Sequence, residues 1–195
     1  IKYMSKGLDD LGVVKTAISK RRANEIGLIK IFGNIFDQLE IQYEVVYSCD
    51  RGDLLFDKEF ECGIYIDESM FYFPKEKKYL SPTSASSRYG YPPNQYAGNY
   101  GYFTRFIQLG DLRSGLGKTK YITPASSQAS VDNFVLTLNL DKLPESSSTI
   151  ERQITGYNAL TYQFILDLVD SENKVEIQES LINYIDADMD ITNME

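Results

Sequence analysis

Histidine is absent from all 195 residues of this chain. A catalytic cysteine is activated by an imidazole that takes the thiol proton and holds the thiolate as an ion pair. That chemistry is therefore excluded, whatever the fold. Cysteine is also scarce: Cys49 and Cys62 are too few for a disulfide framework. We expect them to form either one disulfide or two thiols.

Basic residues are outnumbered, with 20 Lys and Arg against 28 Asp and Glu and a net charge of −8. A protein that binds a nucleic-acid backbone needs a basic patch, and the one basic cluster, Lys20-Arg21-Arg22, is short. We therefore expect no nucleic-acid partner. No run of about 18 apolar residues occurs, so no membrane span is predicted in this segment. The start at Ile1 rather than Met suggests a fragment or a processed product.

The residues that are present have the composition of a soluble globular protein, 43% apolar and 25% charged. The clearest helix is predicted for about residues 22–39, where apolar side chains recur at three- and four-residue spacing. These side chains belong to Ile29, Phe32, Ile35, Phe36 and Leu39. Leu28 and Ile31 widen the stripe, which predicts a central helix. Gly33 within it predicts a close approach to a sheet.

Three strands are predicted after this helix, at 42–48, at 60–67, and at 70–73 continuing into 78–80. The short links between them favour an antiparallel sheet packed on the central helix, which is an α+β fold. Residues 1–19 are expected to be an extended lead-in.

A smaller strand-plus-helix module is predicted downstream. Residues 81–102 and 123–130 have the composition of irregular segments. A strand pair is expected at 133–141 and 148–155, followed by helices at 157–169 and 175–185. This organisation predicts a core at 1–105, a linker or crossing segment at 106–130 and the module at 131–195.

Several short motifs follow one another in a recognisable order. Ala23-Asn24-Glu25 precedes the predicted helix and Leu39-Glu40-Ile41 ends it; Phe60-Glu61-Cys62 and Leu80-Ser81-Pro82-Thr83 follow in the strands. The series resembles the Gly-Asn-Cys, Leu-Gly-Ile, Phe-Asn-His and Asp-Pro-Thr motifs of transglutaminase-like (papain-like) core domains in large bacterial envelope proteins. Further matches to those proteins are Tyr91-Pro92-Pro93, Asn99, Gly101, Arg152 and Gly156.

The resemblance implies that the catalytic Cys, His and Asp of the family are replaced by Glu25, Cys62 and Ser81. It therefore implies a pseudoenzyme: a non-catalytic binding or structural domain, with no cofactor and no metal. The implied location is the periplasm or cell envelope. The implied partners are a protein, peptide or glycan and other domains of the same polypeptide.

Each of the three degenerate positions has a simpler interpretation. Glu25 places a favourable negative charge at a helix start. Cys62 is a buried core residue, a partner of Cys49 in a disulfide, or the displaced nucleophile of a residual thiol-dependent amidase or protease. Ser81 satisfies a local backbone group. An enzyme completed by residues upstream of Ile1 is a further alternative.

Aromatic residues gather in the irregular segment. They could form a carbohydrate- or peptide-binding surface, or they could pack the segment onto its own sheet. The residues concerned are Tyr89, Tyr91, Tyr96, Tyr100 and Tyr102. Two weaker motifs predict no site. Asp186-Ala187-Asp188-Met189-Asp190 has Ile191 where a calcium loop needs Gly, and Gly115-Leu116-Gly117-Lys118-Thr119 lacks the first Gly of a phosphate loop.

Overall fold

The computed structural model describes residues 2–3, 12–59, 66, 68–110, 112–141 and 147–183. The chain forms two compact units, Ile1–Ser127 and Gln128–Glu195, and each is described by itself. The last boundary expected from the sequence was between residues 130 and 131. The segment 106–130, expected as a linker, contains the end of one strand, Tyr100–Leu109, and all of another, Leu112–Tyr121, both in the first unit.

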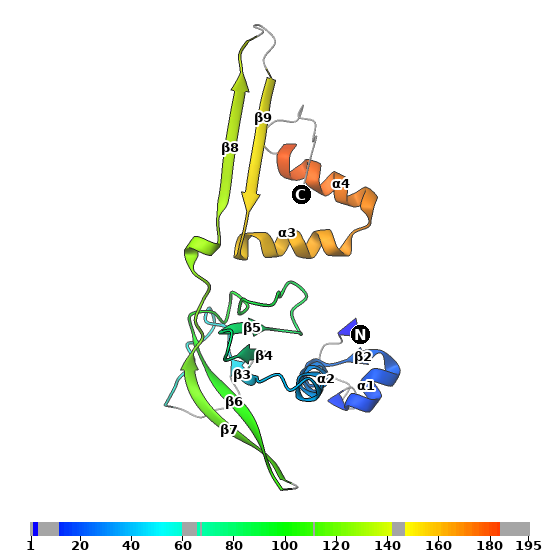
Figure 1. The fold of residues 1–195 in the computed structure, drawn as a ribbon, viewed down its shortest axis with the longest axis vertical. Coiled ribbons are helices and arrows are strands. Elements are labelled where there is room, and N and C mark those ends of the chain that lie inside the picture. Colours follow the sequence, from blue (N-terminus) through cyan, green and yellow to red (C-terminus); the bar gives the residue numbers. More distant parts are fainter. Residues whose placement is uncertain are drawn as a thin grey trace. The chain divides into compact units, whose positions relative to one another are not determined.

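A five-stranded antiparallel sheet forms the centre of the first unit (Figure 1). The strands are β3 (Glu44–Ser48), β4 (Glu68–Phe73), β5 (Lys78–Leu80), β6 (Tyr100–Leu109) and β7 (Leu112–Tyr121). They are arranged in the order β5-β4-β3-β6-β7, and all four neighbouring pairs are antiparallel. The predicted α+β class is confirmed. The predicted strand at 60–67 lies almost entirely outside the described residues.

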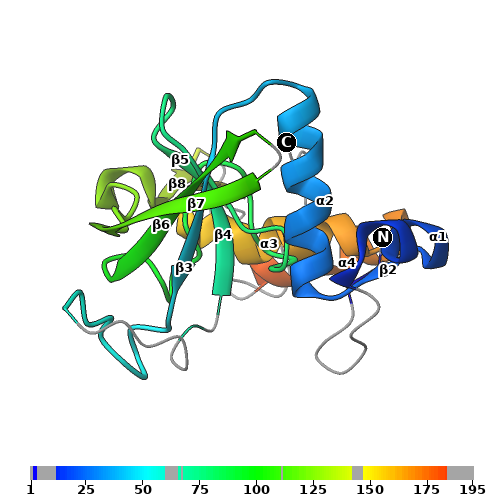
Figure 2. The ribbon, with the colours of Figure 1, turned by 90° about the horizontal axis from the view of Figure 1, so that it is seen from below.

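Helix α2 (Glu25–Gln38) lies beside this sheet (Figure 2). Asn24 caps its first turn, because the Asn24 Oδ1 accepts a hydrogen bond of 2.8 Å from the Gly27 N–H. Ile29, Phe32 and Phe36 pack against a buried sheet cluster of Val45, Phe71 and Phe73. The amphipathic stripe thus covers one face of the sheet. Its outer members are less buried than predicted, since Leu39 is 63% exposed.

The opposite side of α2 contacts α1 (Val14–Lys20), where Ala17 and Ala23 bury against Leu28 and Ile31. The prediction of a central helix is confirmed. The prediction of an extended lead-in is wrong for α1, because a seven-residue helix is too short to show a period. Two further short strands, β1 (Lys2–Tyr3) and β2 (Arg22–Ala23), pair in parallel.

The segment 81–99 is irregular, as the composition predicted for most of 81–102, and it contributes Tyr96 to the other face of the sheet. The core on this face consists of Val46, Met70, Tyr79, Tyr96, Phe103 and Ile122. The sheet is therefore buried on both faces, by α2 and by this segment.

Neither β6 nor β7 was predicted. Two glycines give the β7 sequence a poor strand propensity. Tyr102 explains one of them. A Cβ at Gly117 would lie 1.9 Å from the Tyr102 ring. The Tyr102 ring therefore covers β7 at Gly117, which has no side chain of its own. Pairing with β6 stabilises β7 although its local strand propensity is poor.

The second unit contains the predicted strand pair and the two predicted helices. They are β8 (Asp132–Asn139), β9 (Ser147–Ile154), α3 (Tyr157–Leu168) and α4 (Ser171–Asn183), and a short 3-10 turn, Ser127–Ala129, precedes them. Arg152 bonds both carboxylate oxygens of Asp132 at 2.8 and 2.7 Å. Apolar side chains of β8 remain exposed, including Phe134 and Leu136.

Candidate functional site

Glu25 is the first residue of α2 and directly follows the capping residue Asn24. The position agrees with the predicted helix start, where the free N–H groups favour a carboxylate. Its charge also reaches two neighbouring groups. Burial and the charge of Glu25 together raise the pKa of Tyr47, and Glu25 contributes to a raised pKa of Glu68.

Ser81 directly follows β5 and is 1% exposed. Its Oγ donates a hydrogen bond of 2.8 Å to the Glu68 Oε1, and the Thr83 hydroxyl donates to the same oxygen. The Ser81 N–H donates to the Ser87 Oγ at 3.1 Å. The prediction that the Ser81 hydroxyl satisfies a backbone group is therefore wrong, because a carboxylate takes it.

Glu68 is the centre of this group. Burial raises the pKa of Glu68, hydrogen bonds from Thr83 and Ser81 lower it, and the charge of Glu25 raises it, so that the net effect is upward. Glu68 is thus the side chain that bonds to Ser81 and also senses Glu25. We call Glu25, Glu68, Ser81 and Thr83 the carboxylate cluster.

The sequence analysis did not select Glu68, because strand register brings it to Ser81. Phe71 pairs with Leu80 and Phe73 with Lys78. Continued by three residues, this register places Glu68 opposite Thr83 and diagonal to Ser81. An acidic residue at the start of an apolar strand was the available signal, but the sequence did not indicate its partner.

The cluster contains a hydroxyl that could act as a nucleophile and a carboxylate that could act as a base, but the hydroxyl is not accessible to a substrate. A serine hydroxyl that attacks a substrate has to reach it, whereas Ser81 is buried and its proton is donated to Glu68. Among the described residues, no group of three or more His, Cys, Asp or Glu side chains could hold a metal ion. The hydroxyls of Ser81 and Thr83 are therefore satisfied by Glu68.

The two cysteines differ in what the structure describes. Cys49 is buried, with its Sγ 3.4 Å from the O of Leu54. Cys62 lies outside the described residues, as does the acidic segment 186–190. The expectations for Cys62, as a core residue, a nucleophile or a disulfide partner, stay predictions.

The predicted aromatic site is distributed over both faces of the sheet. Tyr96 is buried with Phe103, and Tyr102 covers Gly117. Successive residues of a strand point to opposite faces, so Tyr102 and Tyr96 lie on opposite faces of the sheet. Tyr91 is half-buried.

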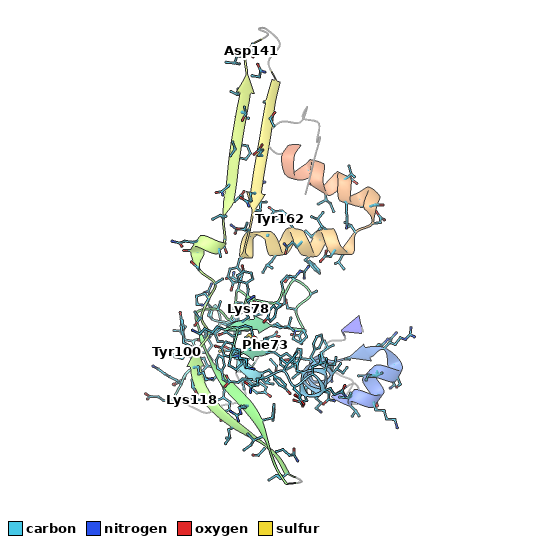
Figure 3. The ribbon with its side chains drawn as sticks, viewed as in Figure 1. Phe73, Lys78, Tyr100, Lys118, Asp141 and Tyr162 are labelled. Carbon is cyan, nitrogen blue, oxygen red and sulfur yellow. The ribbon has the colours of Figure 1, made fainter. Side chains whose placement is uncertain are left out.

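The other two tyrosines contact neighbours outside the group. The Tyr89 ring meets Phe73 edge-on at 5.5 Å, and the Lys78 Nζ lies 5.0 Å from its centre. Phe73 and Lys78 are labelled in Figure 3. The Tyr100 ring meets Tyr121 at 5.5 Å. These contacts favour the interpretation that the tyrosines pack the segment onto the sheet.

The raised pKa of Glu68 predicts an unusual pH dependence for Glu68→Gln. Well below pH 4.5, the ordinary pKa of a glutamate, the carboxyl is protonated in the folded and the unfolded chain alike. Above that pH the unfolded chain loses the proton first, so this group's contribution to stability falls until the folded pKa is passed. We expect Glu68→Gln to gain stability relative to the natural chain as the pH rises from 4.5, measured by urea unfolding at a series of pH values.

Thr83→Val provides the matched variant for this prediction. It removes a donor that favours the ionised carboxylate, so the decline in stability should extend to higher pH than in the natural chain. A stability difference between Glu68→Gln and the natural chain that stays constant with pH would contradict the assignment.

No family model matches this chain, and no curated protein or solved structure matches it. Within the part of the chain that the structure describes, no helix is both long and apolar enough to cross a membrane.

Proposed function

We propose that this chain is a non-catalytic binding or structural domain with a degenerate transglutaminase-like core, part of a larger protein of the bacterial periplasm or cell envelope. The observation that carries the proposal is the carboxylate cluster. It lies where the start of α2 and the ends of two neighbouring strands come together, and it contains two carboxylates and a buried hydroxyl.

One hydrogen bond and one charge interaction of Glu68 support the resemblance. In a catalytic triad of this class, the middle residue contacts both the nucleophile and the orienting residue. Glu68 bonds to Ser81 and senses the charge of Glu25. We therefore propose that Glu68, rather than Cys62, occupies the place of the family's histidine.

The chemistry of these residues supports a silent site. A thiolate needs a nearby cation or base to form, and Glu25 and Glu68 are both acids. Their negative charge would raise the pKa of a neighbouring thiol rather than lower it. A binding or structural role is then what remains for the domain.

Exposed apolar residues in the second unit support membership of a larger assembly. Phe134, Leu136 and Leu138 alternate along β8 and are 45%, 48% and 59% exposed. A two-stranded hairpin with such a face is marginally stable alone, and large exposed apolar patches mark interaction sites. Another domain of the same polypeptide is the partner that we propose for this face.

The test is an activity assay on the purified chain with amine and glutamine donors and with peptide substrates, alongside Cys62→Ser. We expect no turnover from either protein. Turnover that Cys62→Ser abolishes would establish a thiol enzyme and overturn the proposal.

A restoring variant tests the resemblance in the same assay. Glu25→Cys, Glu68→His and Ser81→Asp are combined in the Cys62→Ser background, and Glu25→Cys alone is the matched control. If the three positions correspond to a triad, the introduced thiol should react with iodoacetamide faster at pH 6 in the triple variant than in the control. Equal rates in two folded variants would count against the transglutaminase-like assignment.

A further inference from the structure

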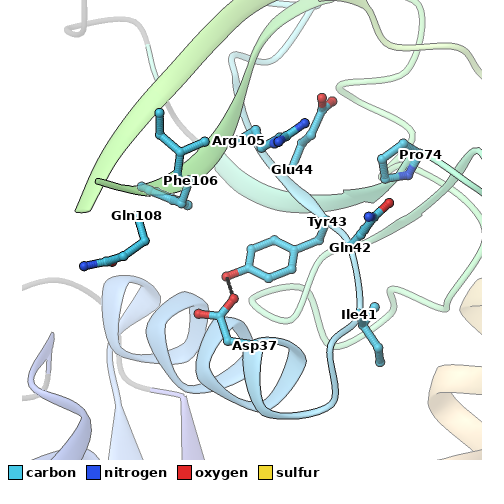
Figure 4. A pocket seen from close by; sticks show the side chains of 10 residues that line it. Asp37, Ile41, Gln42, Tyr43, Glu44, Pro74, Arg105, Phe106 and Gln108 are labelled. Atoms are coloured by element: carbon cyan, nitrogen blue, oxygen red, sulfur yellow. Dashed lines mark hydrogen bonds between the residues drawn. The ribbon is translucent and has the colours of Figure 1, made fainter. Parts of the chain in front are cut away.

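Strands β3 and β6 separate at one end of the sheet. Their pairing includes Val45 with Thr104 and stops there, while β6 continues beside β7 to the pair of Leu109 with Leu112. Residues 39–43, which connect α2 to β3, lead away from β6 toward the end of α2. A hollow of about 660 Å³ fills the resulting wedge (Figure 4), within the range of about 300–1,000 Å³ that is typical of ligand sites.

The lining of this hollow shows that a strand edge faces it. Four consecutive residues of β6, 105–108, line one side, and four consecutive residues, 41–44, line the other. Successive side chains of a strand point to opposite faces, so four in a row can line one hollow only along the edge of the strand. In an antiparallel ladder two of these four β6 residues direct N–H and C=O away from β7. Those groups point into the open space beside β6 from which β3 has diverged. We call this space, next to residues 105–109, the lane.

An apolar hollow of about 320 Å³ adjoins the wedge on the α2 face of the sheet. The two hollows share Tyr43 and Phe106. Ile29 on α2 and Phe71 on β4 also line the apolar hollow. A strand placed in the lane would direct every second side chain toward this apolar surface.

The opposite face of the lane carries one cation, Arg105. Its side chain makes no hydrogen bond or ion pair with another side chain in the described ranges of the chain. Glu44, which falls opposite Arg105 when the register of β3 and β6 is continued by one residue, is bound to the Lys120 Nζ at 2.5 Å. An acidic residue of an added strand on this face would therefore meet Arg105.

We propose that the wedge between residues 41–44 and β6 binds an extended segment of a partner protein as an added strand, with apolar and acidic residues alternating along it. The added strand pairs with residues 105–109, a length of about 16 Å at about 3.3 Å per residue. Backbone hydrogen bonds provide the affinity, and the two chemically different faces provide the specificity. No residue of the carboxylate cluster lines the wedge, so the inference holds whether or not the family resemblance does.

The test is fluorescence anisotropy with the full chain and a labelled eight-residue peptide in which Ile and Asp alternate. We expect saturable binding that Arg105→Gln weakens about fivefold, the upper range for one exposed ion pair. Lys15→Gln, which makes the same charge change on α1, should have no effect. Asn34→Phe, on the exposed rim of the apolar hollow, should fill the hollow and weaken binding at least as much as Arg105→Gln, with circular dichroism confirming that each variant is folded.

Two N-methylated peptides test the strand pairing. A strand on an edge pairs through alternate residues only, so methylating one alternate set of amides should abolish binding and methylating the other should spare it. Equal weakening by both sets would overturn the proposal. So would equal affinity for a peptide in which the four Ile precede the four Asp, or the absence of saturable binding up to 1 mM in folded protein.

Discussion

Replacing Asn99 by alanine is expected to lower the free energy of unfolding of the first unit by about 3–5 kcal/mol. The Asn99 Oδ1 accepts hydrogen bonds from the N–H groups of Phe56 and Tyr100, both at 2.9 Å. Its Nδ2 donates to the carbonyl oxygens of Cys49 at 3.1 Å and Leu54 at 3.2 Å. The side chain thus uses both acceptor sites and both donors.

The size of the expected loss follows from burial. Asn99 is 2% exposed, so water cannot replace its side chain without a rearrangement of the loop at 49–56. Each buried polar group that loses its partner costs about 1–3 kcal/mol, and the substitution removes the partner of several at once. The loop should lose its attachment to β6.

Hydrogen exchange measured by mass spectrometry can locate this effect. Peptides that cover 49–56 should lose protection in Asn99→Ala, and urea unfolding should give the overall loss. Asn94→Ala, an exposed position in the same irregular segment, is the matched control and should change stability by no more than about 0.5 kcal/mol. Equal losses in the two variants would contradict the structural role of Asn99.

Gly156→Ala is expected to destabilise the second unit by about 3 kcal/mol or more. Gly156 has φ +61° and ψ −138°, a combination that residues with a side chain rarely adopt. An added Cβ would lie 2.4 Å from the O of Ala129 and 2.4 Å from the Oγ of Ser130. Both the backbone conformation and the available space therefore require glycine.

The clash would also remove contacts that join the hairpin to α3. The Ser130 Oγ accepts a hydrogen bond of 3.0 Å from the Tyr157 N–H at the start of α3, and the Thr155 Oγ1 donates to the O of Ala129 at 2.9 Å. Since a hairpin with little cover is marginal by itself, the loss of this junction should expose the whole unit to hydrogen exchange.

Gly110→Ala separates the two causes. Gly110 also has a φ of +61°, but nothing lies within 4 Å of its added Cβ. Gly110→Ala should therefore cost only the strain of a positive φ, about 1–2 kcal/mol, without any clash. A loss in Gly156→Ala no larger than in Gly110→Ala, measured by thermal unfolding, would show that the junction adapts to a side chain.

Much of the fold could be predicted from local patterns. The apolar spacing of α2 and the alternation in β8 are strong signals, because one face of each element differs in chemistry from the other. Turn-type composition correctly marked most of 81–102 as irregular. The failures were α1, too short to show a period, β6, whose residues were assigned to an irregular segment and a linker, and β7. Gly115 and Gly117 conceal β7, which exists through its pairing with β6.

The candidate site could be predicted only in part. Glu25 lies at the helix start and Ser81 at the end of β5, as the spacing indicated. Glu68 was missed because its contact with Ser81 depends on the register between β4 and β5. Periodicity predicts which residues share a face, but it contains no information about which residues of two strands lie opposite each other.

The sequence by itself determined which chemistry is absent and which elements form. With no histidine, no arrangement of this chain can supply an imidazole base. Only the tertiary structure decided what the remaining residues do, because register and the divergence of strands depend on contacts distant in sequence. Those contacts join Ser81 to Glu68, attach the loop at 49–56 to Asn99, and leave the edge of β6 open beside Arg105.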